Sequence, residues 1–182
     1  MNFLDLVRKR QSIRAYLNRP VEREKIEKCL EAGRLAPSAV NVQPWQFIVI
    51  DDPALKNQVA EKTFNRIISF NRFTLQAPVL IVVLSNNSGF LNKIKKTIKN
   101  KHFNPIDIGI SVGNICLQAT EEGLGTCILG WFDEKGIKDL LNIPEDKKVK
   151  LLITMGYPAS TEIRLKKRKK LDEIRSYNRY QS

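Results

Sequence analysis

The sequence predicts a single soluble domain in which helices and strands are mixed. Its 182 residues fit one domain of ordinary size, and 42% hydrophobic residues are enough to build a core. Stretches with helical spacing of apolar residues are interleaved with short, continuous apolar runs that are typical of buried strands. Two of the longest apolar runs, 78–84 and 127–132, are far shorter than the ~18 residues that a membrane span requires.

The helix predictions rest on apolar residues that recur every three or four positions. Between Val21 and Arg34 they define one inner face, with acidic residues in the first turn, where the helix dipole favours them. The stretch Ile106–Glu122 has the most buried pattern, and Gly123 is expected to end it in the left-handed conformation. Gly109 and Gly113 allow close approach of another helix, within the chain or across a subunit contact. Shorter helices are predicted at Phe3–Arg10, from Pro53 through Phe64–Phe70, and at Asp133–Leu141.

Four strands are predicted. A central strand is expected at Trp45–Ile50 and a fully buried one at Pro78–Leu84. A third strand, Thr126–Phe132, has Gly130 where it ends, so that a backbone amide can approach a ligand without a Cβ in the way. The fourth covers Lys150–Pro158.

The segment Asn86–Asn104 interrupts this alternation, and both a loose helix and a mobile flap fit its polar, basic composition. His102, the one histidine, has no acidic, Ser or Cys partner nearby in the sequence. We expect it to be structural or exposed rather than catalytic.

The stretch Arg34–Phe47 joins a predicted helix to a predicted strand with small, apolar and Pro-punctuated residues. Each Pro fixes its own φ and biases the residue before it away from helix. We expect a rigid extended loop that presents Ser38 and Asn41 on an apolar floor, a surface suited to one face of a flat ligand. An ordinary helix-to-strand connection is the alternative.

The stretch Arg10-Gln11-Ser12-Ile13-Arg14 follows the first helix as an extended segment. Alternate residues of an extended chain point the same way, so Arg10, Ser12 and Arg14 share one side. Two guanidinium groups that flank a hydroxyl can grip an oxyanion or a phosphate. A solvated basic surface is the alternative.

The charge and cysteine content narrow the functional classes. A net charge of +12 is compatible with phosphate ligands, nucleic acid or anionic lipid. The two lysine-rich clusters, 93–101 and 164–170, have few aromatic residues nearby, so base stacking on nucleic acid is poorly supported.

Three cysteines without a C-x-x-C spacing argue against a disulfide framework and against a zinc site, and no metal is expected. The N-terminus shows no signal peptide pattern, so we expect a cytoplasmic protein without membrane association.

Five stretches, in this order, carry a resemblance to the FMN-dependent nitroreductase family. They cover nearly the whole chain, and finding all of them in order is hard to obtain by accident. The stretches are Arg10–Arg14, Ala36–Phe47, the glycine-containing helix that leads into Gly123–Gly130, Met155–Pro158 and Lys166–Ile174.

The resemblance implies an α+β fold, with a mostly antiparallel central sheet wrapped by helices, in a homodimer with two FMN sites. Residues 1–182 would form one FMN-binding domain, with 86–104 as a variable lid-like segment and 164–182 as a C-terminal extension exchanged over the partner subunit. In that site Arg10 and Ser12 hold the phosphate and ribityl chain, and Arg14 reaches the ribityl or pyrimidine side. The other residues implied to bind the cofactor are Gln11, Pro37, Ser38, Ala39 and Asn41 (the last four from the other subunit), Leu129 and Gly130 through backbone groups, and Lys166 and Arg168 at the phosphate.

The activity implied is ping-pong transfer of a hydride from NAD(P)H, through flavin N5, to a small oxidant such as a nitroaromatic, quinone or enone. No side chain is assigned as the catalytic group, and the Gly130 backbone and Arg14 would support N5 and the reduced flavin. The alternatives are a specialised relative on the same fold, such as a reductive dehalogenase or a flavin-fragmenting enzyme, and a non-enzymatic FMN-binding protein. The chain departs from the family at Leu129, where some larger members have an acidic residue, at Lys170, where Pro is frequent, and over Asn86–Asn104, which matches no motif.

Overall fold

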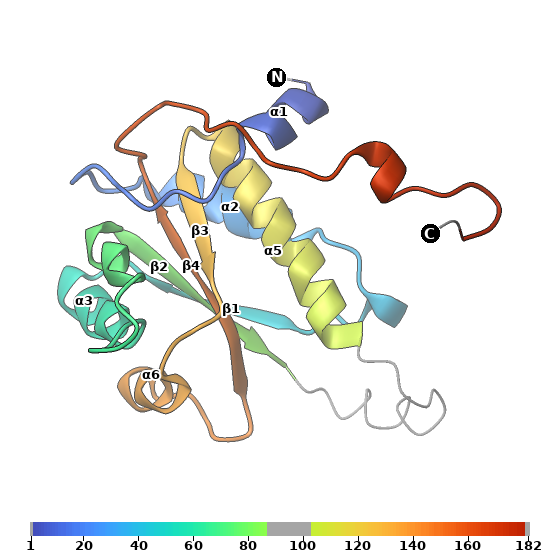
Figure 1. Cartoon of the computed structure of the whole chain (residues 1–182). Coiled ribbons are helices and arrows are strands. Elements are labelled where there is room, and N and C mark those ends of the chain that lie inside the picture. The colour runs from blue at the N-terminus through green and yellow to red at the C-terminus, as the bar shows by residue number, and fades with distance from the viewer. Residues whose placement is uncertain (1, 87–102, 181–182) are drawn as a thin grey trace.

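A four-stranded antiparallel sheet forms the centre of the protein in the computed structural model, which describes residues 2–86 and 103–180 (Figure 1). The strand order is β1-β2-β4-β3, and each neighbouring pair is antiparallel. The predicted α+β class with a mostly antiparallel sheet is therefore confirmed. The strands are β1 (Trp45–Ile50), β2 (Val79–Ser85), β3 (Gly125–Leu129) and β4 (Lys148–Gly156).

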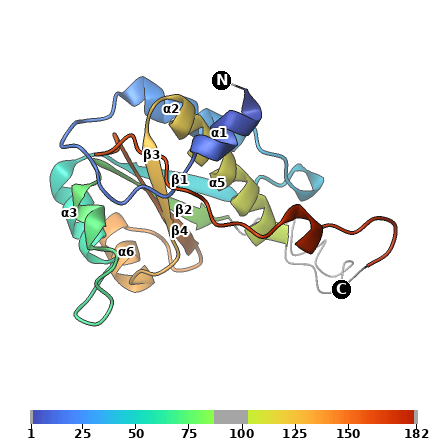
Figure 2. The ribbon, with the colours of Figure 1, turned by 45° about the horizontal axis from the view of Figure 1, so that its top comes forward.

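Helices cover both faces of this sheet (Figures 1 and 2). Two long helices pack against each other on one face, whereas two shorter ones lie on the opposite face with a 3-10 helix, and a fifth helix begins the chain. The α-helices are α1 (Phe3–Lys9), α2 (Arg23–Arg34), α3 (Pro53–Glu61), α5 (Phe103–Glu121) and α6 (Glu134–Leu141); the 3-10 helices are η1 (Ala39–Asn41), η2 (Arg72–Gln76) and η3 (Leu171–Glu173). None of the described helices is long and apolar enough to cross a membrane.

The two faces of β2 explain why its sequence is apolar throughout. Val79, Ile81 and Val83 belong to the core under α2 and α5. Leu80, Val82 and Leu84 belong to the core under α3 and α6. Because successive side chains of a strand point to opposite faces, a strand covered on both faces shows no alternation.

Helices α2 and α5 approach each other at Gly33, where a Cβ would lie 2.7 Å from Cγ1 of Ile115. The buried face predicted for α5 is confirmed, and Gly123 follows the helix with φ +77°. A Cβ at Gly109 or Gly113 would meet no atom within 4 Å, so the close approach predicted there does not occur within the described part of the chain. A subunit contact at these two glycines stays a prediction.

Two expectations about the elements were wrong. Strand β1 lies at the edge of the described sheet, not at its centre. Helix α3 ends at Glu61 instead of running through Phe64–Phe70, because local hydrogen bonds compete with the helix. Thr63 Oγ1 donates to the Ala60 carbonyl at 2.7 Å, and Asn65 Oδ1 accepts from the backbone nitrogen of Ile67 at 2.8 Å.

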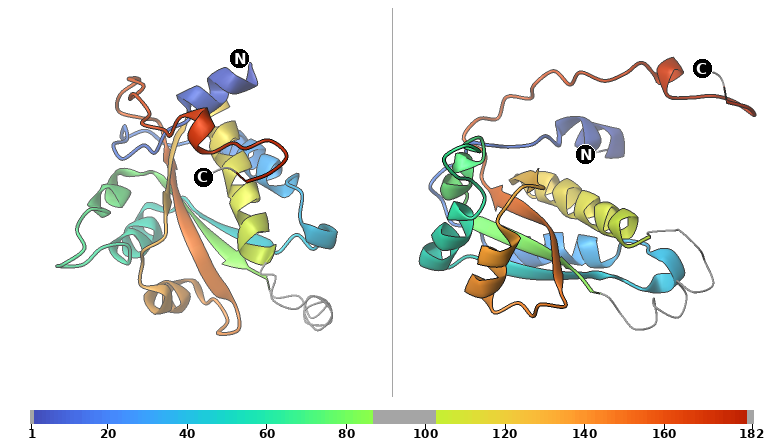
Figure 3. Two further views of the ribbon diagram at one scale, coloured as in Figure 1. Left: turned by 45° about the vertical axis from the view of Figure 1, so that its right-hand side comes forward. Right: turned by 60° about the horizontal axis from the view of Figure 1, so that its bottom comes forward.

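Residues beyond β4 leave the folded body beside α1 and run outward (Figures 1 and 3). From Ile163 onward the large apolar side chains of this segment are exposed, with Leu165 at 95% and Tyr180 at 88%. The exchange of this segment with a partner stays a prediction. Of the predicted lid-like segment 86–104, residues 87–102, with His102 and the first lysine cluster, lie outside the described residues; Asn86 follows β2, and residues 103 and 104 begin α5.

Replacing Ile153 with Ala should destabilise the fold by about 2–5 kcal/mol, because the side chain is fully buried in β4 and its removal leaves a cavity. Thermal or denaturant unfolding measures this. The matched control is Ile67→Ala, the same change at a side chain that is 91% exposed, with an effect within about 0.5 kcal/mol. Equal losses in the two variants would contradict the core described above.

Candidate functional site

The segment 10–14 lies against the start of β3, and its position is fixed by two contacts. Ser12 forms a parallel bridge with Thr126, and the backbone nitrogen of Ile13 donates to the Thr126 carbonyl at 2.9 Å. The Ile13 side chain fills the space over Gly125, where a Cβ would lie 2.5 Å from Cγ1 of Ile13. With Ile13 directed toward the sheet, the extended backbone turns Ser12 and Arg14 to the other side, as the alternation predicts.

The C-terminal segment returns to the same place through the side chain of Gln11. Its Nε2 donates to the Glu162 carbonyl at 2.7 Å, and its Oε1 accepts from the backbone nitrogen and Nε of Arg164 at 3.2 and 3.1 Å. Further along, Lys166 Nζ donates to the Val7 carbonyl at 2.7 Å. Gln11 therefore joins segment 10–14 to the start of the C-terminal segment. The periodicity of the sequence could not predict this contact, because its partners lie about 150 residues away.

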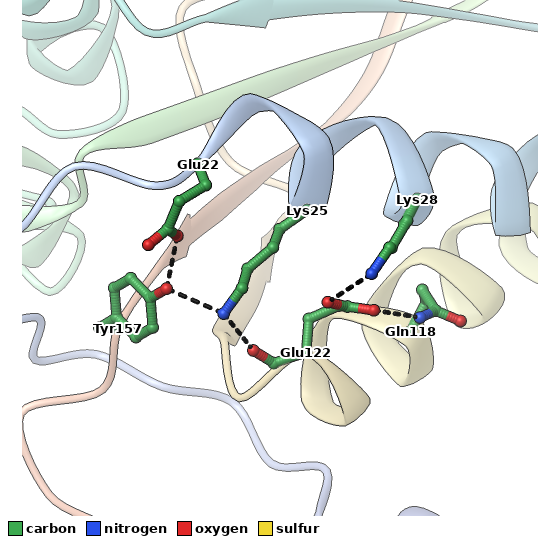
Figure 4. A network of polar contacts seen from close by, with 6 residues as sticks. All are labelled: Glu22, Lys25, Lys28, Gln118, Glu122 and Tyr157. Carbon is green, nitrogen blue, oxygen red and sulfur yellow. Dashed lines mark hydrogen bonds and ion pairs between the residues drawn. The ribbon is translucent and has the colours of Figure 1, made fainter.

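A polar network holds the point from which the C-terminal segment leaves the sheet (Figure 4). Tyr157 follows β4; its hydroxyl accepts from Lys25 Nζ at 2.9 Å and donates to a Glu22 carboxylate oxygen at 2.5 Å. This donation is the main reason that the pKa of Glu22 is lowered to about 2. Lys25 also donates to the Glu122 carbonyl at 3.0 Å. The end of β4 is thus fastened to α2 and to the end of α5.

The two segments enclose a basic pocket of about 330 Å³. Six of its lining residues are Arg or Lys, and none is Asp or Glu. The lining residues, which we call the basic pocket, are Arg10, Gln11, Ser12, Arg14, Arg164, Leu165, Lys166, Lys167 and Arg168. The structure therefore brings together all the residues that were expected at the phosphate. It adds Arg164, which the sequence showed only as one member of a lysine- and arginine-rich cluster.

Within residues 2–86 and 103–180, no carboxylate forms an ion pair with the charged groups of this pocket. Burial and the nearby charges of Arg10 and Arg168 lower the pKa of Lys166. The guanidinium groups of Arg10 and Arg14 make no hydrogen bond to any residue that the structure describes, and Arg14 lies 5.9 Å from the ring centre of Phe73. An anion in the pocket would relieve this repulsion and occupy these donors.

The loop 37–44 is not the simple extended loop that we expected. It contains η1, and Val40, Asn41 and Gln43 have φ values of 47°, 56° and 49°. Ser38 Oγ, one of the two polar groups predicted to face a ligand, accepts from the Gln43 nitrogen at 2.9 Å. Val40 is 66% exposed, so the loop does present apolar surface.

The loop and the basic pocket lie at opposite ends of α5 (Figure 1). Ala39 contacts Asp107 near the start of the helix, whereas segment 10–14 contacts Thr126 beyond its end. Gly130 follows β3; it is exposed, and a Cβ there would meet no atom within 4 Å. One chain therefore does not place the loop residues, Pro37, Ser38, Ala39 and Asn41, around the basic pocket.

Comparisons with known proteins converge on one family. A family model described as "Nitroreductase family" matches residues 7–157. A protein of Archaeoglobus fulgidus, provisionally named NADH dehydrogenase/NAD(P)H nitroreductase, is 33% identical over 159 residues, which are 85% of this chain and 84% of that one. An iodotyrosine deiodinase of Thermotoga neapolitana is 26% identical over 174 residues, covering 85% and 87%. The crystal structure of a nitroreductase family protein from Clostridium novyi NT has a TM-score of 0.78 at 30% identity and covers 90% of this chain and 89% of its own.

Replacing Gly125 with Ala should destabilise the protein by about 1–3 kcal/mol, because the new Cβ overlaps the Ile13 side chain. Unfolding curves of Gly125→Ala, Ile13→Ala and the double variant measure this. The double variant should lose less stability than the two single variants together, since the shortened side chain gives up the closest contact. Strict additivity would show that the two residues do not touch.

Proposed function

Since this chain belongs to the nitroreductase family, we propose that it is an FMN-dependent oxidoreductase that moves a hydride from NAD(P)H to a small oxidant such as a nitroaromatic, quinone or enone. The observation that carries the proposal is the basic pocket, whose unbalanced cations suit the phosphate of FMN. The loop residues at the other end of α5 suit the rest of the cofactor only if two copies of the chain combine. The proposed enzyme is therefore a homodimer.

The basic pocket suits a phosphate in its charge and in the kinds of donor that line it. Arg10, Lys166 and Arg168 surround the space with cations, and Ser12 adds a hydroxyl. Hydrogen bonds between a charged donor and an anion are worth about 1.5–3 kcal/mol each. Since two of these guanidinium groups have no carboxylate partner in the described chain, an anion would not have to displace an ion pair.

When bound, FMN would supply hydride transfer at its N5 atom. The protein would contribute position and charge. Arg10, Ser12, Lys166 and Arg168 would hold the phosphate end, while Gln11 keeps the C-terminal segment against segment 10–14. Arg14, whose guanidinium makes no hydrogen bond in the described chain, would stabilise negative charge at the pyrimidine edge.

The backbone after β3 would contact the flavin ring. Gly130 is exposed there, and a Cβ on it would meet no atom of the described chain within 4 Å. Leu129, buried at 4% exposure, would contribute through its backbone only. The apolar loop with Pro37, Ser38, Ala39 and Asn41 would cover the ring bound by the other copy of the chain. The face left open would take the nicotinamide and then the oxidant in turn, which gives ping-pong kinetics.

A reductive dehalogenase is the second candidate, and the similarity to the Thermotoga neapolitana iodotyrosine deiodinase favours it. The same pocket would then hold the same cofactor, and the oxidant would be a halogenated aromatic. A flavin-fragmenting enzyme and a non-enzymatic FMN-binding protein are further alternatives on the same fold. Steady-state turnover of nitroaromatics, quinones and halotyrosines with NADH and with NADPH distinguishes these candidates.

The purified protein should be yellow, with a flavin spectrum that bleaches when NAD(P)H is added without oxygen. Absorbance near the flavin bands measures both properties. A protein that is colourless and cannot be reconstituted with FMN would overturn the proposed function. A yellow protein that NAD(P)H does not bleach would support FMN binding but contradict NAD(P)H as the electron donor.

Replacing Arg168 or Arg10 with Ala should each weaken FMN binding about tenfold, because each change removes a charged donor from the phosphate, and tenfold corresponds to about 1.4 kcal/mol. Fluorescence titration of FMN into the apoprotein measures the dissociation constant. Lys170→Ala is the matched control: it removes one positive charge from the same segment outside the basic pocket and should change the constant less than twofold. Equal effects of all three substitutions would indicate general charge attraction instead of a phosphate site.

A further inference from the structure

The loop Ser38–Gln43 holds a backbone conformation that its residues disfavour. Val40 has φ 47° and ψ 29°, in the left-handed region, where a β-branched residue is an outlier. Asn41 and Gln43 are also left-handed, with φ 56° and 49°. Such conformations persist only where the surroundings determine them, and they gather at functional sites.

Most of the loop's hydrogen bonds are internal. The Gln43 nitrogen donates to Ser38 Oγ at 2.9 Å, and the Gln43 side-chain amide donates to the Asn41 carbonyl at 3.1 Å. These bonds close the loop on itself, but they do not fix it relative to the helices. In the described chain, one group outside the loop forms a hydrogen bond with it, the carboxylate of Asp107 on α5.

The Asp107 carboxylate faces the start of this loop. Both of its oxygens lie 3.3 Å from the backbone nitrogen of Ala39. The residue is only 5% exposed, and the described chain offers it no ion-pair partner. It also lies beyond the first turn of α5, so it does not cap its own helix. A buried acidic group is costly without a partner, and here the partner is the loop.

We propose that Asp107 is a positioning residue for the cofactor site: through Ala39 it holds the loop Ser38–Gln43 in the strained conformation that covers the flavin of the other subunit. This inference rests on the proposed function. In this proposal α5 holds the loop in place through Asp107, at the end of the helix that lies away from the basic pocket.

If the loop adopts its binding conformation only part of the time, the apparent dissociation constant of FMN rises by the inverse of that fraction. Asp107→Ala should therefore weaken FMN binding about tenfold in the full-length protein. Asp107→Asn keeps an acceptor oxygen toward Ala39 and should weaken it only about threefold. Fluorescence titration of FMN gives both constants, and thermal unfolding of the same samples gives their stability.

A second substitution separates positioning from general destabilisation. Glycine adopts the left-handed conformation without strain. Val40→Gly therefore removes the strain that the contact with Asp107 is proposed to hold. In the Asp107→Ala background, Val40→Gly should recover most of the lost FMN affinity. Should Asp107→Ala not fold, the pair Asp107→Asn and Asp107→Asn/Val40→Gly is read in the same way.

Ser111→Ala is the matched control. Ser111 lies one turn further along α5 and is fully buried. Its hydroxyl donates to the Gly33 carbonyl at 2.9 Å, which is outside the loop Ser38–Gln43. This variant should lose stability and keep its FMN dissociation constant within about twofold. The inference is overturned if Asp107→Ala binds FMN as the wild type does, or if Val40→Gly recovers none of the loss. Wild-type protein that binds no FMN would instead overturn the proposed function.

Discussion

The bridge between Ser12 and Thr126 is the contact on which the candidate site depends. Strand β3 is an edge of the described sheet, and the segment after α1 covers its free side as one short extended stretch. This contact sets the register of the alternating side chains, and the Gln11 amide then captures the C-terminal segment. The basic pocket thus forms because segment 10–14 covers the edge strand β3.

Collecting like charges is unfavourable for the fold itself, and two features keep the cost low. The arginine and lysine side chains of the basic pocket are exposed or half-buried, so water and salt screen them. The backbone of segment 10–14 is also held by a bond that does not involve the charges, the one from the Ile13 nitrogen to the Thr126 carbonyl. A bound anion would turn the same repulsion into stabilisation, because any ligand that binds only the folded state stabilises it.

The sequence was enough to predict the elements whose pattern is local. The apolar run of β2 and the buried face of α5 both appear where expected, because burial on two faces or along one stripe leaves a direct periodic signal. The edge position of β1 could not be foreseen, since strand order depends on pairing between distant residues. At the site, alternation predicted that Arg10 and Ser12 share one side, and both line the basic pocket. Arg164 and Asp107 were not recognised, because their partners, Gln11 and Ala39, lie 153 and 68 residues away.

In the proposed homodimer, the exposed C-terminal segment would give the protein a second source of stability beside its core. The cores on either side of the sheet are complete within one chain, and their contribution does not depend on how many chains are present. Leu165 and Tyr180 gain almost nothing from the folding of their own chain. A partner subunit that covered them in the proposed homodimer would add stability by mass action, and that part of the total would rise with the protein concentration. Dilution would then loosen the C-terminal segment while the sheet stays folded.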